Sequence, residues 1–415
     1  MAVNGIIAEF AEEAAFLWVL RTRAVDEPHF SLDDLARLDE RLEAHLDGLR
    51  VAGEAGWERC KESLGSSNPA ECFAPGVLAF ESGETERIQA VLDAVDNNYA
   101  KTRVLISALG WLSNERACPQ FKKLLVSESP LHRYIGIAAS AIHRHDPGHH
   151  LDKAVNDPDI LLMARGLRAH GELAREIKIT SFRLRENLTD DDERIRFSSA
   201  WSAVLAGNKE AVAVLKDVVC TNSPYKEKAL NTALRRMEPG AALSWQKQLA
   251  ESPQTIRFAV IGAGIIGDPA LIPWLIGQMK TPALSRVAGE AFTMITGADI
   301  DREELRGKRP EGFAAGPNDD PNDENVAMDA DDSLPWPNSE SIRQWWNEHK
   351  GTFQNGARYL LGKPISAEHL RHVLQKGLQR QRAAAALELA IIEPGRPLFE
   401  VRAPGFRQRI EVEHI

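Results

Sequence analysis

The fold is indicated most clearly by two consecutive segments, IRFAVIGAGIIGDPALIPWLIGQM (256–279) and PALSRVAGEAFTMITG (282–297). Each stretch opens with a basic residue, Arg257 or Arg286, near the start of a segment of small and apolar residues. A second apolar segment, PALIPWLIGQM (269–279), follows the first with apolar residues at helical spacing. This pattern predicts a unit of two helices that repeats along the chain.

The same pattern recurs throughout the middle of the sequence. Successive basic residues are 30, 32, 31, 32, 29 and 29 positions apart. A fixed period of about 30 residues with two helices per unit is typical of HEAT-like repeats. We therefore predict an all-α fold, an armadillo-like α-solenoid. The ladder of basic residues comprises Arg103, Arg133, Arg165, Arg196, Lys228, Arg257 and Arg286.

Two further positions keep the phase of the ladder. Small residues allow close approach of neighbouring helices, and apolar residues fill the seam between units. Five positions after the ladder, five of seven residues are small, at Ala108, Ala138, His170, Trp201, Ala233, Gly262 and Ala291. Nine positions after it, all seven are apolar, at Leu112, Ile142, Ala174, Leu205, Met237, Ile266 and Ile295.

The ladder has a structural and a ligand-binding interpretation. Acidic residues stand just upstream of several rungs, at Asp159, Glu193 and Glu227. Ion pairs at helical spacing are common and individually weak. The structural role, pairing within or between repeats, is therefore the favoured one.

The rest of the chain divides around this array. We predict a helical N-terminal cap over 1–97, the array over 98–298, an acidic linker over 299–338 and a helical region over 339–415. Ser31 provides a helix N-terminal signal within the cap. The linker is rich in Asp, Asn, Gly and Pro, so we expect it to be exposed, mobile and cut first by proteases.

Charge and cysteine usage exclude several classes of protein. The net charge is −10, and residues 299–340 alone carry thirteen acidic and four basic residues. The remaining body is nearly neutral and has no basic stripe for nucleic acid. The four cysteines are far apart, which fits neither a zinc site nor a disulfide framework. Without an apolar run long enough to span a bilayer, a cytoplasmic protein with no membrane segment is expected.

Two motifs suggest chemistry that their context does not support. GAGIIG (262–267) matches a dinucleotide-binding pattern, but Asp268-Pro269 follows at once and would interrupt the helix that such a site needs. HRHDPGHH (143–150) gathers four histidines, yet Pro147-Gly148 marks a turn between repeat helices. An enzyme that uses the Gly262–Gly267 turn or the His143–His150 cluster is therefore the least favoured alternative.

A third motif resembles a calcium-binding loop. DADDSLPWPNSE (329–340) has oxygen-bearing residues at several EF-hand positions, but Leu334 replaces the glycine that the sharp turn requires. A solvated acidic run is favoured. We predict no catalytic residue, no cofactor and no metal site.

The first helix after the acidic segment carries two adjacent tryptophans. Ile342, Trp345, Trp346 and His349 form a stripe at helical spacing. Adjacent helix residues diverge by about 100°, so one indole can face solvent while the other is buried. We take Trp345 and Trp346 as candidate anchors for a partner protein; in the alternative, both pack on the array.

Several long segments resemble bacterial HEAT-repeat-like proteins encoded in type VI secretion gene clusters. The resemblance covers nearly the whole chain. It is most specific in PHFSLDDLARLDERLEAHLDGLRVAGEAGW (28–57), IGDPALIPWLIGQMKTPALSRVAGEAFTMITG (266–297), SIRQWWNEHKGTF (341–353), GARYLLGKPI (356–365), GLQRQRAAAALELA (377–390) and PLFEVRAPGFRQ (397–408).

This resemblance implies a protein partner and no catalytic residues. It suggests a scaffold or adaptor that handles secreted effectors or spike components. An immunity-type protein that blocks a toxin is the alternative. The resemblance indicates no particular oligomeric state.

Overall fold

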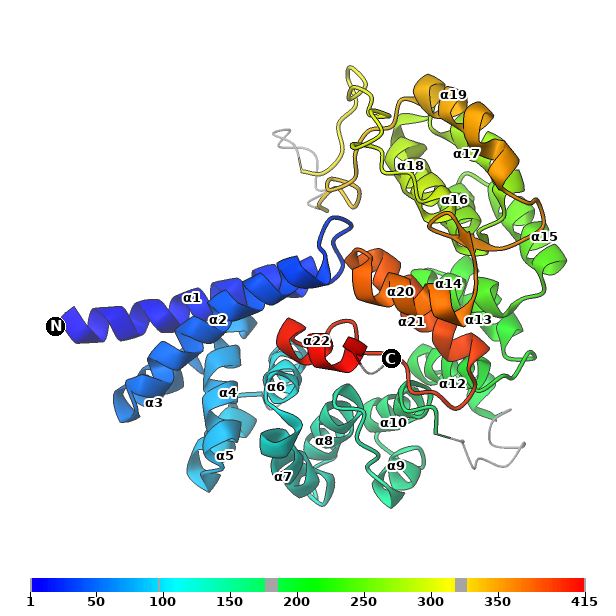
Figure 1. The fold of residues 1–415 in the computed structure, drawn as a ribbon. Coiled ribbons are helices and arrows are strands. Elements are labelled where there is room, and N and C mark those ends of the chain that lie inside the picture. The colour runs from blue at the N-terminus through cyan, green and yellow to red at the C-terminus, as the bar shows by residue number, and fades with distance from the viewer. Residues whose placement is uncertain (1, 96–97, 176–185, 318–326, 414–415) are drawn as a thin grey trace. The chain divides into compact units, whose positions relative to one another are not determined.

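The computed structural model describes residues 2–95, 98–175, 186–317 and 327–413, and it is almost entirely α-helical (Figure 1). The only strands in these ranges are β1 (Tyr359–Leu360) and β2 (Lys363–Pro364), which pair antiparallel. The predicted all-α class is therefore confirmed. None of the described helices combines the length and apolar character that crossing a bilayer requires.

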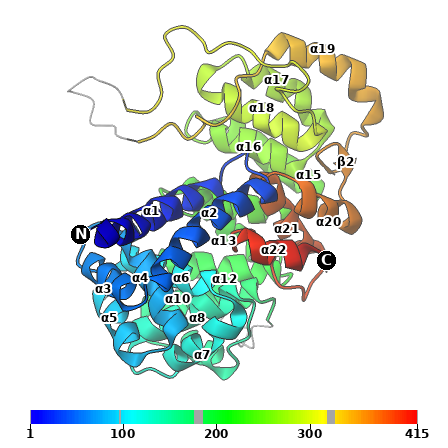
Figure 2. The same cartoon turned by 60° about the vertical axis from the view of Figure 1, so that its left-hand side comes forward.

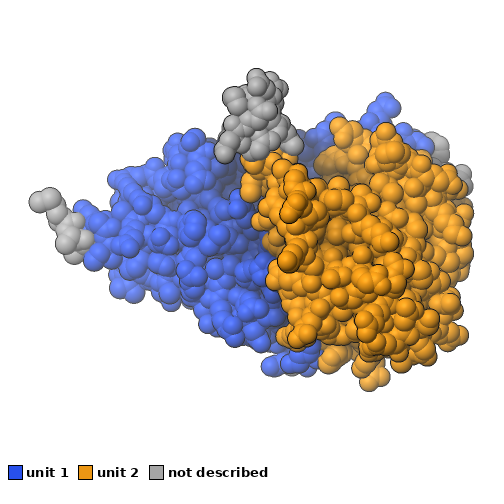
Figure 3. All heavy atoms as spheres, turned by 90° about the horizontal axis from the view of Figure 1, so that it is seen from above, with its two compact units in different colours: residues 1–208, 373–415 blue, residues 209–372 orange. Residues whose placement is uncertain are grey.

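The chain forms two compact units, coloured separately in Figure 3. Unit 1 comprises residues 1–208 and 373–415, and unit 2 comprises residues 209–372. The predicted array over 98–298 is thus divided between the units. The C-terminal helices belong with the N-terminal half of the chain.

Unit 1 is built from helices throughout its described length. The first group is α1 (Ala2–Ala24), α2 (Leu32–Val51), α3 (Glu54–Ser63), η1 (Pro69–Cys72), α4 (Phe73–Ser82) and α5 (Thr85–Val95). The repeats are α6 (Tyr99–Trp111), α7 (Asn114–Leu125), α8 (Pro130–Ile142), α9 (His149–Ala154), α10 (Ile160–Glu172) and α12 (Glu193–Leu205). The C-terminal group is α20 (Ala367–Lys376), which begins in unit 2, α21 (Gln379–Ile392) and α22 (Gly405–Glu413).

Unit 2 continues the repeats and adds a helix and a hairpin. Its elements are α13 (Val212–Cys220), α14 (Lys226–Arg236), α15 (Pro239–Ala250), α16 (Ile256–Ile266), η2 (Pro269–Leu271), α17 (Ile272–Gln278), α18 (Pro282–Thr296), α19 (Ser339–His349), η3 (Lys350–Thr352), β1 and β2. The predicted restart of helix at Ser339 is confirmed.

Repeat helices stack in order within each unit. Helices α6, α8, α10 and α12 pack in succession in unit 1, and α14, α16 and α18 do so in unit 2. Each ladder residue lies in the first two turns of one of these helices. All seven residues five positions later are buried, including the large His170 and Trp201. The repeat phase predicted from the sequence therefore marks the faces on which these helices pack.

Local signals set where several helices begin. The Ser31 hydroxyl accepts a hydrogen bond from the backbone N–H of Asp34, whose carboxylate accepts one from Ser31 N–H in return. The Ser31 hydroxyl also donates to the Asp34 carboxylate at 2.6 Å, and this hydrogen bond, with the one from Ser31 N–H, lowers the pKa of Asp34. Such a capping box satisfies N–H groups that a helix start leaves unpaired. The predicted N-terminal signal at Ser31 is thus confirmed.

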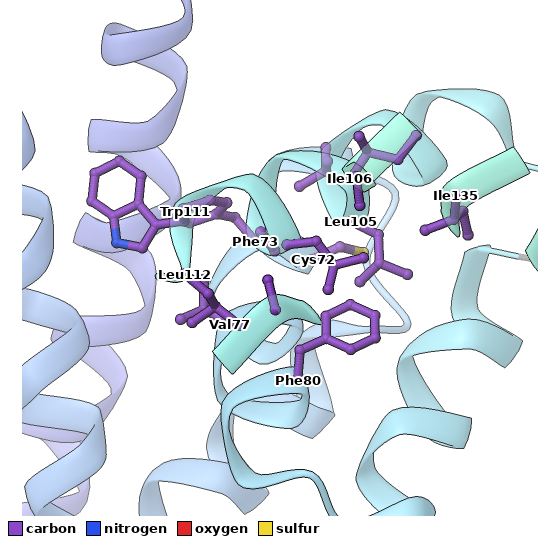
Figure 4. Close-up of a cluster of buried hydrophobic side chains, with 14 of the residues drawn as sticks. Cys72, Phe73, Val77, Phe80, Leu105, Ile106, Trp111, Leu112 and Ile135 are labelled. Carbon is purple, nitrogen blue, oxygen red and sulfur yellow. The ribbon is translucent and has the colours of Figure 1, made fainter. Parts of the chain in front are cut away.

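The core of unit 1 lies between its first helices and its first repeat. Phe73 of α4 and Trp111 of α6 pack edge to face with ring centroids 5.6 Å apart (Figure 4). Val77 and Leu105 are fully buried beside them. Apolar burial of this kind supplies most of the free energy that holds stacked helices together.

The two ends of the chain are joined by a buried ion pair in unit 1. Asp39 of α2 accepts from Arg21 of α1 at 3.0 Å and from the backbone N–H of Gly405 at 2.6 Å. Arg21 also donates to the carbonyl of Ala403 at 2.7 Å. Burial raises the pKa of Asp39 despite the charge of Arg21. The pair holds α22, which lies in the region predicted to be helical over 339–415, beside α2 (Figure 2).

Helix α22 also reaches the ends of two repeat helices. Arg407 donates to the carbonyls of Gly110, at 3.1 Å, and Ile142, at 2.8 Å. It also lies 3.1 Å from Nδ1 of His143, whose Nε2 lies 2.9 Å from the carbonyl oxygen of Leu109. A neutral imidazole protonated on Nε2 satisfies both contacts. Burial, and then the charge of Arg407, lower the pKa of His143 to about 4.

The glycine motif at 262–267 is part of a helix. Gly262 and Gly264 lie inside α16, and Gly267 ends that helix in the left-handed conformation with φ of 75°. A Cβ at Gly264 would lie 3.0 Å from Cα of Ala291 in α18. These glycines allow close packing of helices, and no strand precedes them among the described residues. The turn interpretation is confirmed at Gly267.

We predict that Gly264→Ala lowers the free energy of unfolding by about 1–3 kcal/mol, because the methyl group would push α16 away from α18. Gly277→Ala is the matched control, since nothing lies within 4 Å of a Cβ at that helical position. The control should be neutral or stabilising by up to about 1 kcal/mol. Urea denaturation checks both, and equal stability of the two variants would contradict the close approach.

A second prediction concerns acid. The neutral His143 stabilises the fold above its unfolded pKa, and this contribution is lost as the pH falls from about 6.5 towards about 4. Between pH 7.5 and 5 the loss should reach about 2 kcal/mol. Urea unfolding of wild type and His143→Gln at both pH values measures it. The variant should lose less stability than wild type, and equal losses would contradict the assignment.

Candidate functional site

A pocket of about 530 Å³ lies in unit 2 between two helical segments. One wall is η2 with α17, and the other is α19, η3 and the residues that follow. Its lining residues are Pro269, Ala270, Pro273, Ile276, Arg343, Trp346, Asn347, Lys350, Phe353 and Asn355.

The inner part of the pocket is apolar. Ile276 of α17 is 2% exposed and Trp346 of α19 is 8% exposed, and Pro269 is also buried. The ring centroids of Trp346 and Phe353 are 5.4 Å apart, and Phe353 is half-buried. Aromatic and proline surfaces of this kind favour an apolar side chain as occupant.

The rim of the pocket on α19 is polar and cationic. Arg343 and Asn347 of α19, and Lys350 directly after it, are exposed and spaced i, i+4, i+7, so they lie on one side. Lys350 Nζ donates to Oδ1 of Asn347 at 3.1 Å. Arg343 pairs with Glu340 at 3.4 Å, with both side chains exposed to solvent. No lining residue carries a carboxylate.

The two predicted anchors have different environments. Trp346 lines the pocket, whereas Trp345 does not. Trp345 packs edge to face on Phe292 of α18 at 5.4 Å and stacks on His349 at 4.1 Å. Its indole N–H donates to the carboxylate of Glu303. Trp345 thus packs α19 onto α18, and Trp346 is the indole that a ligand could contact.

The segment before α19 positions that helix. Asn338 caps it by accepting from the backbone N–H groups of Glu340 and Ser341, at 3.0 and 3.1 Å. The backbone N–H of Asn338 donates to the carbonyl of Leu305 at 2.7 Å. The start of α19 is therefore tied to the chain that leaves α18.

Two rungs of the ladder bind the acidic segment. Arg257 donates hydrogen bonds from both terminal nitrogens to the Asp331 carboxylate, at 2.8 and 2.5 Å. Arg286 donates to both carboxylate oxygens of Asp329, at 2.9 and 2.7 Å, and to the carbonyl of Asp331 at 2.9 Å. The guanidinium of Arg286 also lies 4.5 Å from the ring centre of Trp336. The contact of Arg257 with Asp331 uses two nitrogens and two oxygens, the planar arrangement in which arginine binds a carboxylate most strongly.

These contacts correct part of our expectation for the linker. Asp331 and Leu334 are each 6% exposed, so this end of the segment is packed and not solvated. Burial raises the pKa of Asp329, but hydrogen bonds from Arg286 and from the Asp331 N–H outweigh that effect and leave the pKa low. The hydrogen bonds that Arg257 donates to the Asp331 carboxylate raise the pKa of Arg257.

The remaining rungs have varied environments. Arg133 donates to the turn carbonyls of Ser127 and Glu128, and to Asp157 at 2.8 Å. Arg196 makes the same type of contact with the two turn carbonyls before α12. Arg103 and Lys228 are exposed. Most rungs therefore fasten turns or segments of the same chain, as the structural interpretation predicted.

Arg165 is the rung inside a buried charge cluster of unit 1. It donates to Glu172 at 2.7 Å, and Arg168 donates to the same carboxylate at 2.8 Å. Burial raises the pKa of Glu172, but the charges of Arg165, Arg168 and Arg144 outweigh burial and lower the pKa to about 2. This carboxylate is a fixed negative charge and no proton donor near neutral pH.

The histidine cluster is not gathered around one point. His143 contacts Leu109 of α6 and Arg407, as described above, while the rings of His149 and His150 lie at a tilt with centroids 4.0 Å apart at the start of α9. In the described ranges, no three His, Cys, Asp or Glu side chains are grouped to hold a metal ion. Asp329 and Asp331 of the EF-hand-like motif are bound by arginine.

No family model matches this chain, and no curated protein shows significant similarity to it. The assignment to a type VI secretion context therefore stays a prediction.

Sequence reasoning identified Trp346 but missed most of the pocket. Arg343, Asn347 and Lys350 have a helical spacing that could have indicated a polar stripe beside Trp346. The opposing wall, from Pro269 to Ile276, was interpreted only as a second repeat helix. Nothing local in the sequence shows that the two segments face each other.

We predict that Arg286→Ala loosens the acidic segment and lowers the free energy of unfolding by about 1–3 kcal/mol, because half-buried Asp329 and the carbonyl of Asp331 lose the buried guanidinium that binds them. Arg103→Ala is the matched control from the same ladder, where the exposed side chain should change stability by less than about 0.5 kcal/mol. Limited proteolysis with an Asp-directed protease measures release of residues 329–332. Unchanged cleavage there in Arg286→Ala would contradict the assigned role of Arg286.

Proposed function

We propose that this chain is a non-enzymatic scaffold or adaptor that binds another protein through the pocket of unit 2. The observation that carries the proposal is the apolar interior formed by Ile276 and Trp346 beneath the exposed cations Arg343 and Lys350. Tryptophan and arginine are the side chains most enriched where protein interfaces concentrate their binding energy.

The dimensions of the pocket suit a side chain of a larger partner. Ligand pockets for complete small molecules span about 300–1,000 Å³ and usually enclose the ligand. Here the cavity of about 530 Å³ opens onto the exposed side of α19. An anchor side chain can enter it while the rest of the partner covers the helix surface. Specific association would need burial of at least about 1,000 Å² in all.

The class of partner comes from the resemblance noted in the sequence. Proteins encoded in type VI secretion clusters act beside effectors and spike components, which are assembled in the cytoplasm before export. We propose one of these as the partner. Several ladder arginines bind acidic groups of their own chain, whereas Arg343 and Lys350 at the pocket are exposed, which supports the pocket as a binding surface.

A charge-reversal pair tests this function. Lys350→Glu should reduce delivery of a co-encoded effector relative to the wild-type protein, because the reversed charge repels an acidic partner. Assembly of the sheath should stay intact. Lys280→Glu is the control, because it makes the same charge change at an exposed residue of unit 2 outside the pocket. Delivery assays and fluorescence microscopy of the sheath provide the readouts.

The opposite results have clear meanings. Normal effector delivery in a deletion strain would show that the adaptor role is wrong. Protection of a sensitive cell from a co-encoded toxin, with delivery unaffected, would support the immunity role instead.

A further inference from the structure

We infer that the pocket of unit 2 recognises a segment of a partner protein in which an apolar side chain stands next to an Asp or Glu. The inference rests on the proposed function, and it specifies the chemistry of the partner. The apolar side chain would lie against Trp346 and Ile276. The neighbouring carboxylate would bind at the rim, at Lys350 and Arg343.

Charge complementarity selects an acidic ligand. The pocket is lined by two cations, two amides and no carboxylate, although the whole chain carries a net charge of −10. A local excess of positive charge on an acidic protein attracts an anionic group and disfavours a basic one. The amides of Asn347 and Asn355 add hydrogen-bond donors to the same rim.

The rim cations are available for a new partner. Lys350 donates to the neutral amide of Asn347, and within the described residues no carboxylate lies within ion-pair distance of it. Arg343 has an ion pair with Glu340 in the same helix, with 45% and 82% of the two side chains exposed. Exposed pairs of this kind contribute little free energy, so a ligand carboxylate can replace them at low cost.

Unit 2 already binds one segment of this composition from its own chain. Arg257 and Arg286 hold Asp329 and Asp331, and the apolar Leu334 that follows is buried. That contact combines carboxylate–cation pairs with burial of a nearby apolar residue. The pocket offers the same two elements to an external segment.

The experiment uses the full chain labelled with 5-fluorotryptophan and two peptide probes. The probes are acetyl-Gly-Phe-Asp-Gly-amide and acetyl-Gly-Phe-Asn-Gly-amide, which differ only in the charge of one side chain. Fluorine NMR follows the Trp346 resonance, assigned with Trp346→Phe. We expect both probes to shift this resonance, and the Asp probe to bind roughly two- to fivefold tighter at low salt.

Matched variants isolate the rim. Lys350→Gln should remove most of the preference for the Asp probe, and Lys280→Gln should preserve it, because Lys280 is exposed outside the pocket. Equal affinities of the two probes for the wild-type protein would overturn the acidic specificity while leaving the pocket as an apolar binding site. Failure of both probes to shift the Trp346 resonance would overturn the specificity and the proposed function together.

Discussion

The close approach of successive repeat helices is the constraint on which the rest of unit 2 depends. At Gly264 the backbone of α16 comes so near to Ala291 of α18 that a Cβ would be only 3.0 Å away. This contact holds α16 and α18 together. Helix α18 contacts α19 through the rings of Phe292 and Trp345, and α19 also packs against α17. Trp346 lines the pocket between α19 and α17.

A second layer of constraint comes from arginines that bind their own chain. In unit 2 two ladder arginines hold the acidic segment that leads to α19. In unit 1 Arg21 and Arg407 attach the C-terminal segment to the N-terminal helices and to the first repeats. Charged side chains thus position non-repeating segments against the repeats. These arginines bind groups of their own chain. The cations at the rim of the pocket differ from them because they are exposed to solvent.

The sequence predicted the features that arise from local pattern. The repeat phase located seven packing helices, the cap at Ser31 marked the start of α2, and α19 begins at Ser339 as expected. These features depend on helical periodicity and on hydrogen bonds across a few residues. Trp346 was identified in the same way, from its place on an apolar stripe.

The features that were missed depend on contacts between distant residues. The pairing of Arg286 with Asp329 spans 43 positions, and that of Asp39 with Gly405 spans 366. No periodicity encodes such partners, so the packing of the acidic segment and the placement of α22 were not predictable. The same reason explains why Trp345 and Trp346 could not be told apart. Helix geometry gives the angle between the two indoles, but it does not show which residues of other helices pack against each of them.

We propose that a partner protein binds at the pocket of unit 2. Site-specific photo-crosslinking tests it most directly, with p-benzoylphenylalanine at Asn347 on the rim and, for comparison, at the exposed Lys247 of α15. In cells that produce the protein together with the proteins encoded beside it, position 347 should crosslink to a secreted effector or spike component. Position 247 should not. Crosslinking from both positions alike, or from neither, would show that the pocket is not the place at which the partner binds.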